Sequence, residues 1–422
     1  MAPAETIETV VIGAGHAGLA MSYELSRRGV PHAVLERGRV GETWRARRWD
    51  AFWLIMPNWG LDLPGFPYQG DRDAFTDRDG FVAYLERYAA RFGAPVRPGV
   101  DVTALDPAPD GGFVLATSAG PLRAASVVVA TSIYHAARRP TFAANLPPDI
   151  LQLDPDTYRN TQSLPPGAVL VVGTGQSGAQ IAEDLVLGGR RVYLAVGRTG
   201  RVPRRYRGTD SSWWFAIGRF HGPDGEKLGG DAHRSGRDGG RDLNLHRFAR
   251  DGVTLLGRVT GARGHLLDLA DDLHANLAYA DAYAAAFRAG VDGYIAERGL
   301  DAPPPDPSPD EALADGFALS APPELDLRAA GITTVVWATG YGVDFSWVHA
   351  PVIDEDGHLA HDRGVTAVPG LYCVGMTFRE DPKSTFIRVV GWEAERVADH
   401  IAARAGAGTA DGAPEGTLAA AG

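Results

Sequence analysis

The sequence repeats one pattern twice: a short apolar strand, a glycine-rich turn and an apolar helix. In the first copy, the β-branched run Ile7–Ile12 ends at Gly13-Ala-Gly-His-Ala-Gly18, and apolar residues then recur at helical spacing. In the second copy, Ala168–Val172 ends at Gly173-Thr-Gly-Gln-Ser-Gly178 and leads into a similar helix. The two copies are separated by far more residues than one repeat of a solenoid protein contains. The pattern predicts an α/β protein with two similar units, each built on a parallel sheet.

The first glycine turn has the spacing of a dinucleotide-binding fingerprint. Gly13 would make the tight turn, Gly15 would let a pyrophosphate approach the backbone, and Gly18 would let helix and strand pack closely. Glu36 ends the next expected strand, 23 residues after Gly13. A carboxylate there accepts hydrogen bonds from ribose hydroxyls and repels a 2′-phosphate. We therefore expect the first unit to bind FAD or NAD.

The second glycine turn has no acid at the corresponding strand end. Seven arginines and no carboxylate lie between Arg190 and Arg207, in a chain whose net charge is -11. Guanidinium groups pair with phosphates, which favours NADPH at this turn. A solvated basic surface or an RNA-contacting strip is the alternative, and it leaves the glycine fingerprint unexplained. The candidate contacts of this second cofactor are Gly173, Gly175, Ser177, Gly178, Arg198, Arg204 and Arg205.

Composition excludes several other classes of protein. The acidic balance, 41 basic against 52 acidic residues, argues against a general nucleic-acid binder and against docking on an acidic membrane surface. The single cysteine, Cys373, excludes a disulfide framework, a Cys-rich zinc site and a dithiol redox couple. No metal site, no signal peptide and no membrane span are expected. A cytoplasmic setting fits best, and a homodimer is left open.

Taken together, the motifs resemble the flavin-containing monooxygenase superfamily, which includes N-hydroxylating, Baeyer–Villiger and plant YUCCA-like enzymes. The resemblance covers the chain from about Thr9 to Ala403. Its motifs are, in chain order, Gly13–Gly18 with Glu36, Gly41-Glu-Thr-Trp44, Pro57-Asn-Trp59, Leu63-Pro-Gly65, Phe75-Thr-Asp-Arg78, Tyr84-Leu85, Gly173–Gly178, Ala338-Thr-Gly-Tyr341 and Gly370-Leu-Tyr-Cys-Val-Gly375.

The resemblance implies an α/β fold with two Rossmann-like dinucleotide-binding domains, the NADPH domain being inserted into a split FAD domain. We expect the FAD domain at residues 1–160 and 331–404, and the NADPH domain, with a helical substrate-lining insertion, at residues 161–330. A disordered tail is expected at residues 405–422. The implied reaction passes a hydride from NADPH to FAD, forms a C4a-peroxyflavin with O2, and transfers one oxygen atom to a small organic substrate.

The resemblance also implies roles for three further residues. Trp44 would pack beside the flavin, and Asn58 matches an asparagine that could hydrogen-bond a flavin peroxide. Lys383, one of only two lysines, would stabilise reduced flavin from the start of the last helix. Plain turn chemistry for Asn58 and a surface position for Lys383 are the alternatives.

Two departures from the family pattern keep other functions open. Asp154 stands where the signature before the second glycine motif has a histidine, although Tyr158 is kept, and Ser132 replaces the glycine of an early Ala-Thr-Gly. The Asp154 departure weakens a typical Baeyer–Villiger assignment. The alternatives are an NADPH-dependent flavin oxidase or reductase without oxygen transfer, and a non-enzymatic nucleotide-sensing transport accessory protein.

Overall fold

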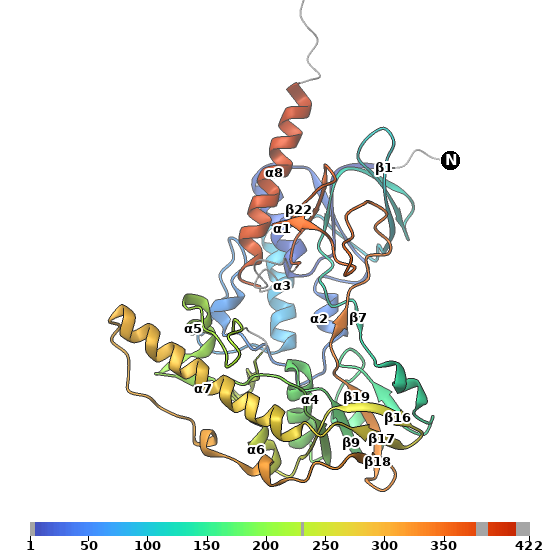
Figure 1. The fold of residues 1–422 in the computed structure, drawn as a ribbon. Coiled ribbons are helices and arrows are strands. Elements are labelled where there is room, and N and C mark those ends of the chain that lie inside the picture. Colours follow the sequence, from blue (N-terminus) through green and yellow to red (C-terminus); the bar gives the residue numbers. More distant parts are fainter. Residues whose placement is uncertain (1–4, 229–231, 377–386, 411–422) are drawn as a thin grey trace, which may run out of the picture.

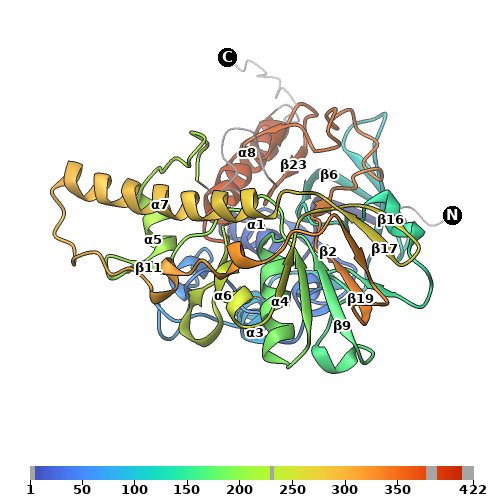
Figure 2. The same ribbon diagram turned by 60° about the horizontal axis from the view of Figure 1, so that its bottom comes forward.

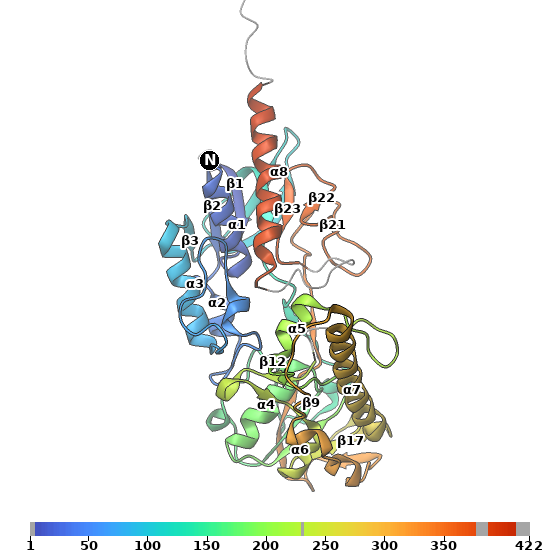
Figure 3. The ribbon, with the colours of Figure 1, turned by 90° about the vertical axis from the view of Figure 1, so that its left-hand side faces the viewer.

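The computed structural model describes residues 5–228, 232–376 and 387–410, which form two lobes, one above the other in Figure 1. We call the upper lobe the first unit and the lower lobe the second unit. Figure 3 shows the same division from the side, with α8 and α1 in the first unit and α4 and α7 in the second. Each lobe contains one main sheet, so the expected α/β class with two similar units is confirmed.

The first unit is built on a sheet that has nine strands within the described part of the chain. Its central order is β21-β22-β23-β6-β1-β2-β3, and β1 pairs in parallel with both β2 and β6. The strands are β1 (Glu5–Ile12), β2 (His32–Glu36), β3 (Val96–Pro98), β4 (Val102–Pro107), β5 (Phe113–Thr117), β6 (Leu122–Val129), β21 (His361–Asp362), β22 (Val365–Thr366) and β23 (Leu371–Cys373).

Successive side chains along each strand of the first sheet point to opposite faces, and both faces are buried. Val11 packs on one side with the helices α1 (His16–Arg27), α3 (Arg78–Phe92) and α8 (Val390–Ala410). Val10 and Ile12 point to the other side, where β5 and a loop near Phe345 complete a second core. Burial on both faces explains why the strand sequence is a nearly continuous apolar run.

The second unit is built on a five-stranded parallel sheet, counted over the described residues, in the order β15-β10-β9-β19-β8. Its strands are β8 (Leu151–Leu153), β9 (Ala168–Val172), β10 (Val192–Ala195), β15 (Thr254–Leu256) and β19 (Ile332–Trp337). The helices α4 (Gln176–Leu187) and α6 (Leu245–Arg250) cover one face. The other face packs against the small sheet formed by β16 (Val259–Arg263), β17 (Leu266–Leu269) and β18 (Glu324–Asp326).

An insertion extends the second unit beyond its sheet. The long helix α7 (Leu273–Arg298) begins in the core beside α4 and then projects past the sheet, as Figures 1 and 2 show. There it packs with α5 (Ser211–Ile217) around Trp214, Phe220 and Phe287. Two short hairpins complete the insertion: β11 (Arg205–Tyr206) with β12 (Thr209–Asp210), and β13 (Arg234–Ser235) with β14 (Arg241–Asp242).

The chain crosses between the units at β7 (Ala136–Ala137) and β20 (Tyr341–Gly342), which pair with each other. Sheet membership therefore differs from the expected boundaries at 160/161 and 330/331. Both β8, before residue 160, and β19, after residue 331, belong to the sheet of the second unit, because β19 pairs with β9 and β8 pairs with β19. We place the two crossings at β7 and β20.

The C-terminal expectations are met only in part. Residues 405–410, expected in a disordered tail, continue α8, and residues 411–422 lie outside the described residues. Lys383 also lies outside them, so its expected position at the start of the last helix is not described. No helix in the described ranges is long and apolar enough to cross a membrane.

Candidate functional site

A cavity of about 1290 Å³ lies between the two units. This is larger than the roughly 300–1,000 Å³ of a typical small-molecule pocket. The first unit lines it with residues that include Gly13, Gly15, Glu36 and Trp44, and the second unit lines it with Gly175, Gln176 and Ser177. The two predicted glycine turns therefore open onto one shared space.

The first-unit wall has the features of a nucleotide cradle. α1 begins after Gly15 without a side-chain cap and without an acid in its first turn, so its first backbone N–H groups are left for a ligand. A Cβ added at Gly15 would meet no atom within 4 Å, whereas at Gly18 it would lie 1.8 Å from the Gly13 carbonyl oxygen. Gly15 thus leaves room for a ligand, and Gly18 allows α1 to pack on β1.

Glu36 is fixed at the end of β2 by two backbone donors. Its Oε2 accepts a hydrogen bond from the Ala14 N–H at 2.8 Å, and its Oε1 accepts one from the Gly38 N–H at 2.9 Å. The side chain is buried yet lines the cavity. Each carboxylate oxygen has a second lone pair, so Glu36 can still accept hydrogen bonds from hydroxyl groups of a ligand.

Aromatic side chains form the wall beside Glu36. Trp44, in α2 (Glu42–Ala46), packs against Phe81 with ring centroids 4.9 Å apart and against Phe52 at 6.0 Å. The His16 ring lies 6.2 Å from Trp44, and burial lowers the pKa of His16 to about 4. His16 is therefore neutral near pH 7, and this wall can exclude water from a flat ring system.

The second-unit wall repeats the same cradle. Gly173 adopts φ +100°, and a Cβ there would lie 2.5 Å from the Ala338 carbonyl oxygen, so the turn requires glycine. α4 begins after Gly175 with no side-chain cap and no acid in its first turn. Gly178 has the packing role of Gly18, since a Cβ there would lie 2.0 Å from the Gly173 carbonyl oxygen.

The three arginines predicted at the second cofactor have different positions. Arg204 is buried, pairs with Asp210 and lies over the Phe75 ring, so it supports the fold. Arg205 is exposed and donates to the Gly239 and Gly240 carbonyls. Neither side chain lines the cavity, so their positions do not support the prediction that both bind a 2′-phosphate. Arg198, just beyond β10, does not line the cavity either; it pairs with Asp224 and lies 4.1 Å from the Tyr279 ring centroid, and its phosphate role stays a prediction.

Two cavity-lining arginines were not predicted as site residues. Arg47 and Arg48 share the carboxylate of Asp156, at 3.6 and 3.8 Å, and Tyr341 donates a hydrogen bond to the same carboxylate at 2.7 Å. Arg48 also lies over the Trp44 ring, 5.4 Å from its centroid. They directly follow the Gly41–Trp44 motif, which was the only sequence signal for them.

A buried carboxyl group, also missed from the sequence, lines the first-unit side of the cavity. Glu393, in the first turn of α8, accepts a hydrogen bond from the Gly375 N–H at 2.7 Å. Its other oxygen has no hydrogen-bond partner among the described residues. Burial raises the pKa of Glu393 to about 7. This group can therefore gain or lose a proton near neutral pH.

Asn58 lies behind the cavity wall. Its neighbours Met56 and Trp59 line the cavity, whereas Asn58 is buried and donates from Nδ2 to the Asp71 carbonyl at 2.7 Å. Its Oδ1 has no hydrogen-bond partner within the described part of the chain. Asn58 is thus next to cavity-lining residues in the sequence, but its own side chain does not line the cavity. Its catalytic role stays a prediction.

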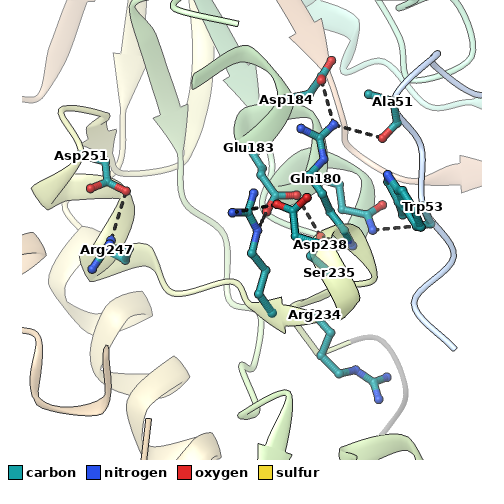
Figure 4. A network of polar contacts seen from close by, with 12 residues as sticks. Ala51, Trp53, Gln180, Glu183, Asp184, Arg234, Ser235, Asp238, Arg247 and Asp251 are labelled. Atoms are coloured by element: carbon teal, nitrogen blue, oxygen red, sulfur yellow. Dashed lines mark hydrogen bonds and ion pairs between the residues drawn. The ribbon is translucent and has the colours of Figure 1, made fainter. Parts of the chain in front are cut away.

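Residues from α4 and the insertion hold the segment of residues 51–55 of the first unit against the second unit. Figure 4 shows Gln180 and Asp184 of α4 facing Trp53 and Ala51. Arg237 bridges the Asp184 carboxylate at 3.0 Å and the Ala51 carbonyl at 3.2 Å. Buried Tyr158 donates to the other Asp184 oxygen at 2.7 Å. The signature tyrosine therefore contacts this junction through Asp184.

Asp154, which replaces the signature histidine, lies near the same junction. It forms a bidentate ion pair with Arg139, with both nitrogen–oxygen distances at 2.7 Å. Both residues follow β7, close to where the chain crosses between the units. The replacement is thus accommodated as a structural ion pair outside the cavity lining.

Comparison with known proteins identifies the family. Residues 10–214 match the family model described as pyridine nucleotide-disulphide oxidoreductase. An uncharacterized CzcO-like oxidoreductase of Geobacillus kaustophilus is 31% identical over 94% of this chain and 98% of its own length. Rice indole-3-pyruvate monooxygenase YUCCA1 is 34% identical over 47% of this chain and 50% of its own.

A solved structure extends the likeness to the whole fold. The flavin-containing monooxygenase from Stenotrophomonas maltophilia superposes with a TM-score of 0.67 over 95% of this chain and 99% of its own, at 17% identity. The chain belongs to the flavin-containing monooxygenase superfamily, and it is an oxidoreductase with a full-length CzcO-like relative. The resemblance drawn from the motifs is confirmed.

Within the described residues, no group of three or more His, Cys, Asp or Glu side chains is placed to hold a metal ion. Cys373 is buried at the end of β23, and burial raises the pKa of its thiol. The single cysteine of this sequence therefore has neither a partner for dithiol chemistry nor the thiolate character of a nucleophile.

Proposed function

We propose that this chain is an FAD- and NADPH-dependent monooxygenase that transfers one oxygen atom from O2 to a small organic substrate. The observation that supports this most directly is the shared cavity. Two uncapped helix N-termini, each preceded by a glycine turn, open onto one space of about 1290 Å³. Two dinucleotides bound there would have their reactive ends in the same cavity.

The first-unit wall fits FAD. The N–H groups at the start of α1 would hold its pyrophosphate beside Gly15, where no side chain obstructs the backbone. Glu36 would accept hydrogen bonds from the adenosine ribose. Trp44 would cover the flavin, and its contact with Phe81 holds the indole in place.

The second-unit wall fits NADPH. The start of α4, with Gly175 and Ser177, would hold the pyrophosphate, and Arg198 is the candidate for the 2′-phosphate. Arg47 and Arg48 add a net positive charge to the cavity because they share one carboxylate. Their position between Trp44 and Tyr341 lets them attract the anionic part of a ligand that spans the two units.

The chemistry supplied at these two walls, with FAD held by Glu36 and the start of α1 and NADPH by the start of α4, would be the two-electron reduction of O2, with one oxygen atom entering the substrate and the other forming water. The residues of this chain would bind, orient and exclude water. The neutral His16 ring and the Trp44 and Phe52 rings keep the wall apolar. Glu393 can hold or release a proton at Oε1 near neutral pH, which would balance protons during turnover.

Flavin retention tests the first-unit assignment. Glu36→Ala removes the proposed ribose acceptor, so purified protein is expected to lose most of its bound flavin, with a dissociation constant raised about tenfold or more. Glu42→Ala is the matched control, because Glu42 is a second cavity-lining carboxylate that contacts Arg39. Flavin content is measured by absorbance against protein concentration. Equal flavin occupancy in wild type and Glu36→Ala would contradict the assignment.

A further inference from the structure

Gln180 is a buried amide on the cavity wall whose NH2 group is hydrogen-bonded and whose oxygen, within the described part of the chain, is not. It lies on α4, one helical turn beyond Gln176, and only 4% of its surface is exposed. Its Nε2 donates to the Trp53 carbonyl at 3.3 Å. Its Oε1 is buried and accepts no hydrogen bond from the described residues.

The contact with Trp53 fixes which way the amide faces. If the amide were flipped, Oε1 would face the Trp53 carbonyl oxygen and two acceptors would oppose each other. The acceptor is therefore held away from Trp53, as the orientation in Figure 4 shows. A buried acceptor without a donor is unfavourable. Gln180 Oε1 can therefore accept a hydrogen bond from a donor that the described residues do not supply.

Gln176 provides a contrast on the same helix. Both ends of its amide are used, since Nε2 donates to the Arg234 carbonyl and Oε1 accepts from the Arg234 N–H at 3.3 Å. Gln176 and Gln180 both line the cavity. Only Gln180 retains an unused acceptor, so a ligand-binding role is specific to it.

The location of Gln180 indicates which ligand group would supply the donor. Its amide joins the second unit to the first unit at Trp53, and the neighbouring Phe52 lines the same cavity, with its ring centroid 6.0 Å from that of Trp44. At the reactive end of a nicotinamide dinucleotide, the ring carries a carboxamide whose NH2 group is a hydrogen-bond donor. A donor at this junction would satisfy Gln180 and orient the ring.

We propose that Gln180 Oε1 accepts a hydrogen bond from the carboxamide NH2 of the nicotinamide ring and thereby orients that ring across the junction of the two units. This inference rests on the proposed function, because it requires NADPH in the cavity. It makes Gln180 a cofactor-binding residue that recognises the carboxamide, distinct from the residues that hold the phosphates.

The test compares the binding of two coenzymes to flavin-loaded protein by calorimetry. One is NADP⁺, and the other is its 3-acetylpyridine analogue, in which a methyl ketone replaces the carboxamide and removes the N–H donors. Wild type is expected to bind NADP⁺ about tenfold more tightly than the analogue. Gln180→Met also removes the hydrogen bond to Trp53, so both coenzymes can lose some affinity, but NADP⁺ should lose about tenfold more than the analogue, so the preference disappears.

Gln176→Met is the matched control, and it should retain the preference even if both coenzymes bind more weakly. A loss of affinity for both coenzymes by the same factor in Gln180→Met would assign Gln180 to structural support and overturn the proposal. A wild type that binds the two coenzymes equally would overturn it without any variant. A wild type that binds neither would overturn the NADPH function itself, and the carboxamide contact with it.

Discussion

Arg198 and Asp224 form an ion pair close to the second glycine turn, and both side chains are more than half exposed. If Arg198 binds the 2′-phosphate of NADPH, that phosphate must compete with the Asp224 carboxylate for the same guanidinium group. The pair therefore allows the coenzyme preference to be shifted in both directions.

Arg198→Ala should weaken NADPH binding about tenfold or more and leave NADH binding nearly unchanged, because only NADPH carries the 2′-phosphate. Asp224→Asn should strengthen NADPH binding a few-fold, since the competing charge is removed. Titration of each coenzyme against flavin-loaded protein measures both effects. Equal changes for NADPH and NADH in Arg198→Ala would remove Arg198 from the phosphate site.

Glu393 should give the protein a pH-dependent stability of defined sign. Burial raises the pKa of its carboxyl from 4.5 to about 7 in the folded protein, so the folded state binds more protons than the unfolded state between these values. The stabilisation is fully present below pH 4.5 and is lost as the pH rises through 7, at most about 3 kcal/mol in all. Glu393→Gln should show a smaller decline in the free energy of unfolding from pH 5 to pH 8. Parallel pH profiles for the two proteins would contradict this.

Among individual residues, the sequence predicts those whose role follows from a motif in the neighbouring sequence. Glu36 and the glycines could be found because they stand at fixed distances from a strand end. Gln180 and Glu393 could not, because their roles depend on distant contacts: Gln180 meets Trp53 across 127 residues. The position of Arg204 could not be predicted either, since its ion pair with Asp210 and its contact with the Phe75 ring bury a charge that the sequence places in an arginine-rich segment.

At the scale of elements, the glycine turns at the start of α1 and α4 each serve two purposes: they leave room for a ligand, and they let the helix pack against the preceding strand. Each helix begins at a glycine with open space and contains, three residues further on, a glycine pressed against the preceding turn. A substitution at the first glycine should therefore impair ligand binding, and a substitution at the second glycine should lower the stability of the fold.

Gly18→Ala should lower the free energy of unfolding by about 1–3 kcal/mol, because a Cβ would lie 1.8 Å from the Gly13 carbonyl oxygen and α1 would have to shift. Gly15→Ala should leave stability within about 0.5 kcal/mol, since no atom lies within 4 Å of the new methyl group, yet it should impair flavin binding. Denaturant unfolding and flavin content separate the two effects. Equal losses of stability in the two variants would contradict this division.

The strands next to these turns were predicted to within a few residues, because a buried parallel strand is a short apolar run with a clear end. β8 is only three residues long, and nothing local assigns it to the second sheet. That assignment comes from its pairing with β19, nearly two hundred residues later. The sequence therefore could not place β8 in the sheet of the second unit.

At the scale of the whole molecule, the relation between the two units determines what the protein can do. Gln180, Arg204 and Arg237 of the second unit all donate hydrogen bonds to backbone carbonyls of residues 51–55 in the first unit. These contacts join the two units beside the cavity, which Leu54 and Ile55 help to line. The sequence predicts two units and two cofactors, but the shape of their junction depends on long-range contacts.

Rapid mixing of the NADPH-reduced, flavin-loaded protein with oxygenated buffer tests the proposed monooxygenase function most directly, with the flavin absorbance followed over time. We expect a transient species whose spectrum differs from those of both reduced and oxidised flavin, because the aromatic wall around Trp44 would limit the access of water to a bound flavin. A direct return to oxidised flavin, with one hydrogen peroxide released per NADPH consumed, would contradict the proposed function and identify an oxidase.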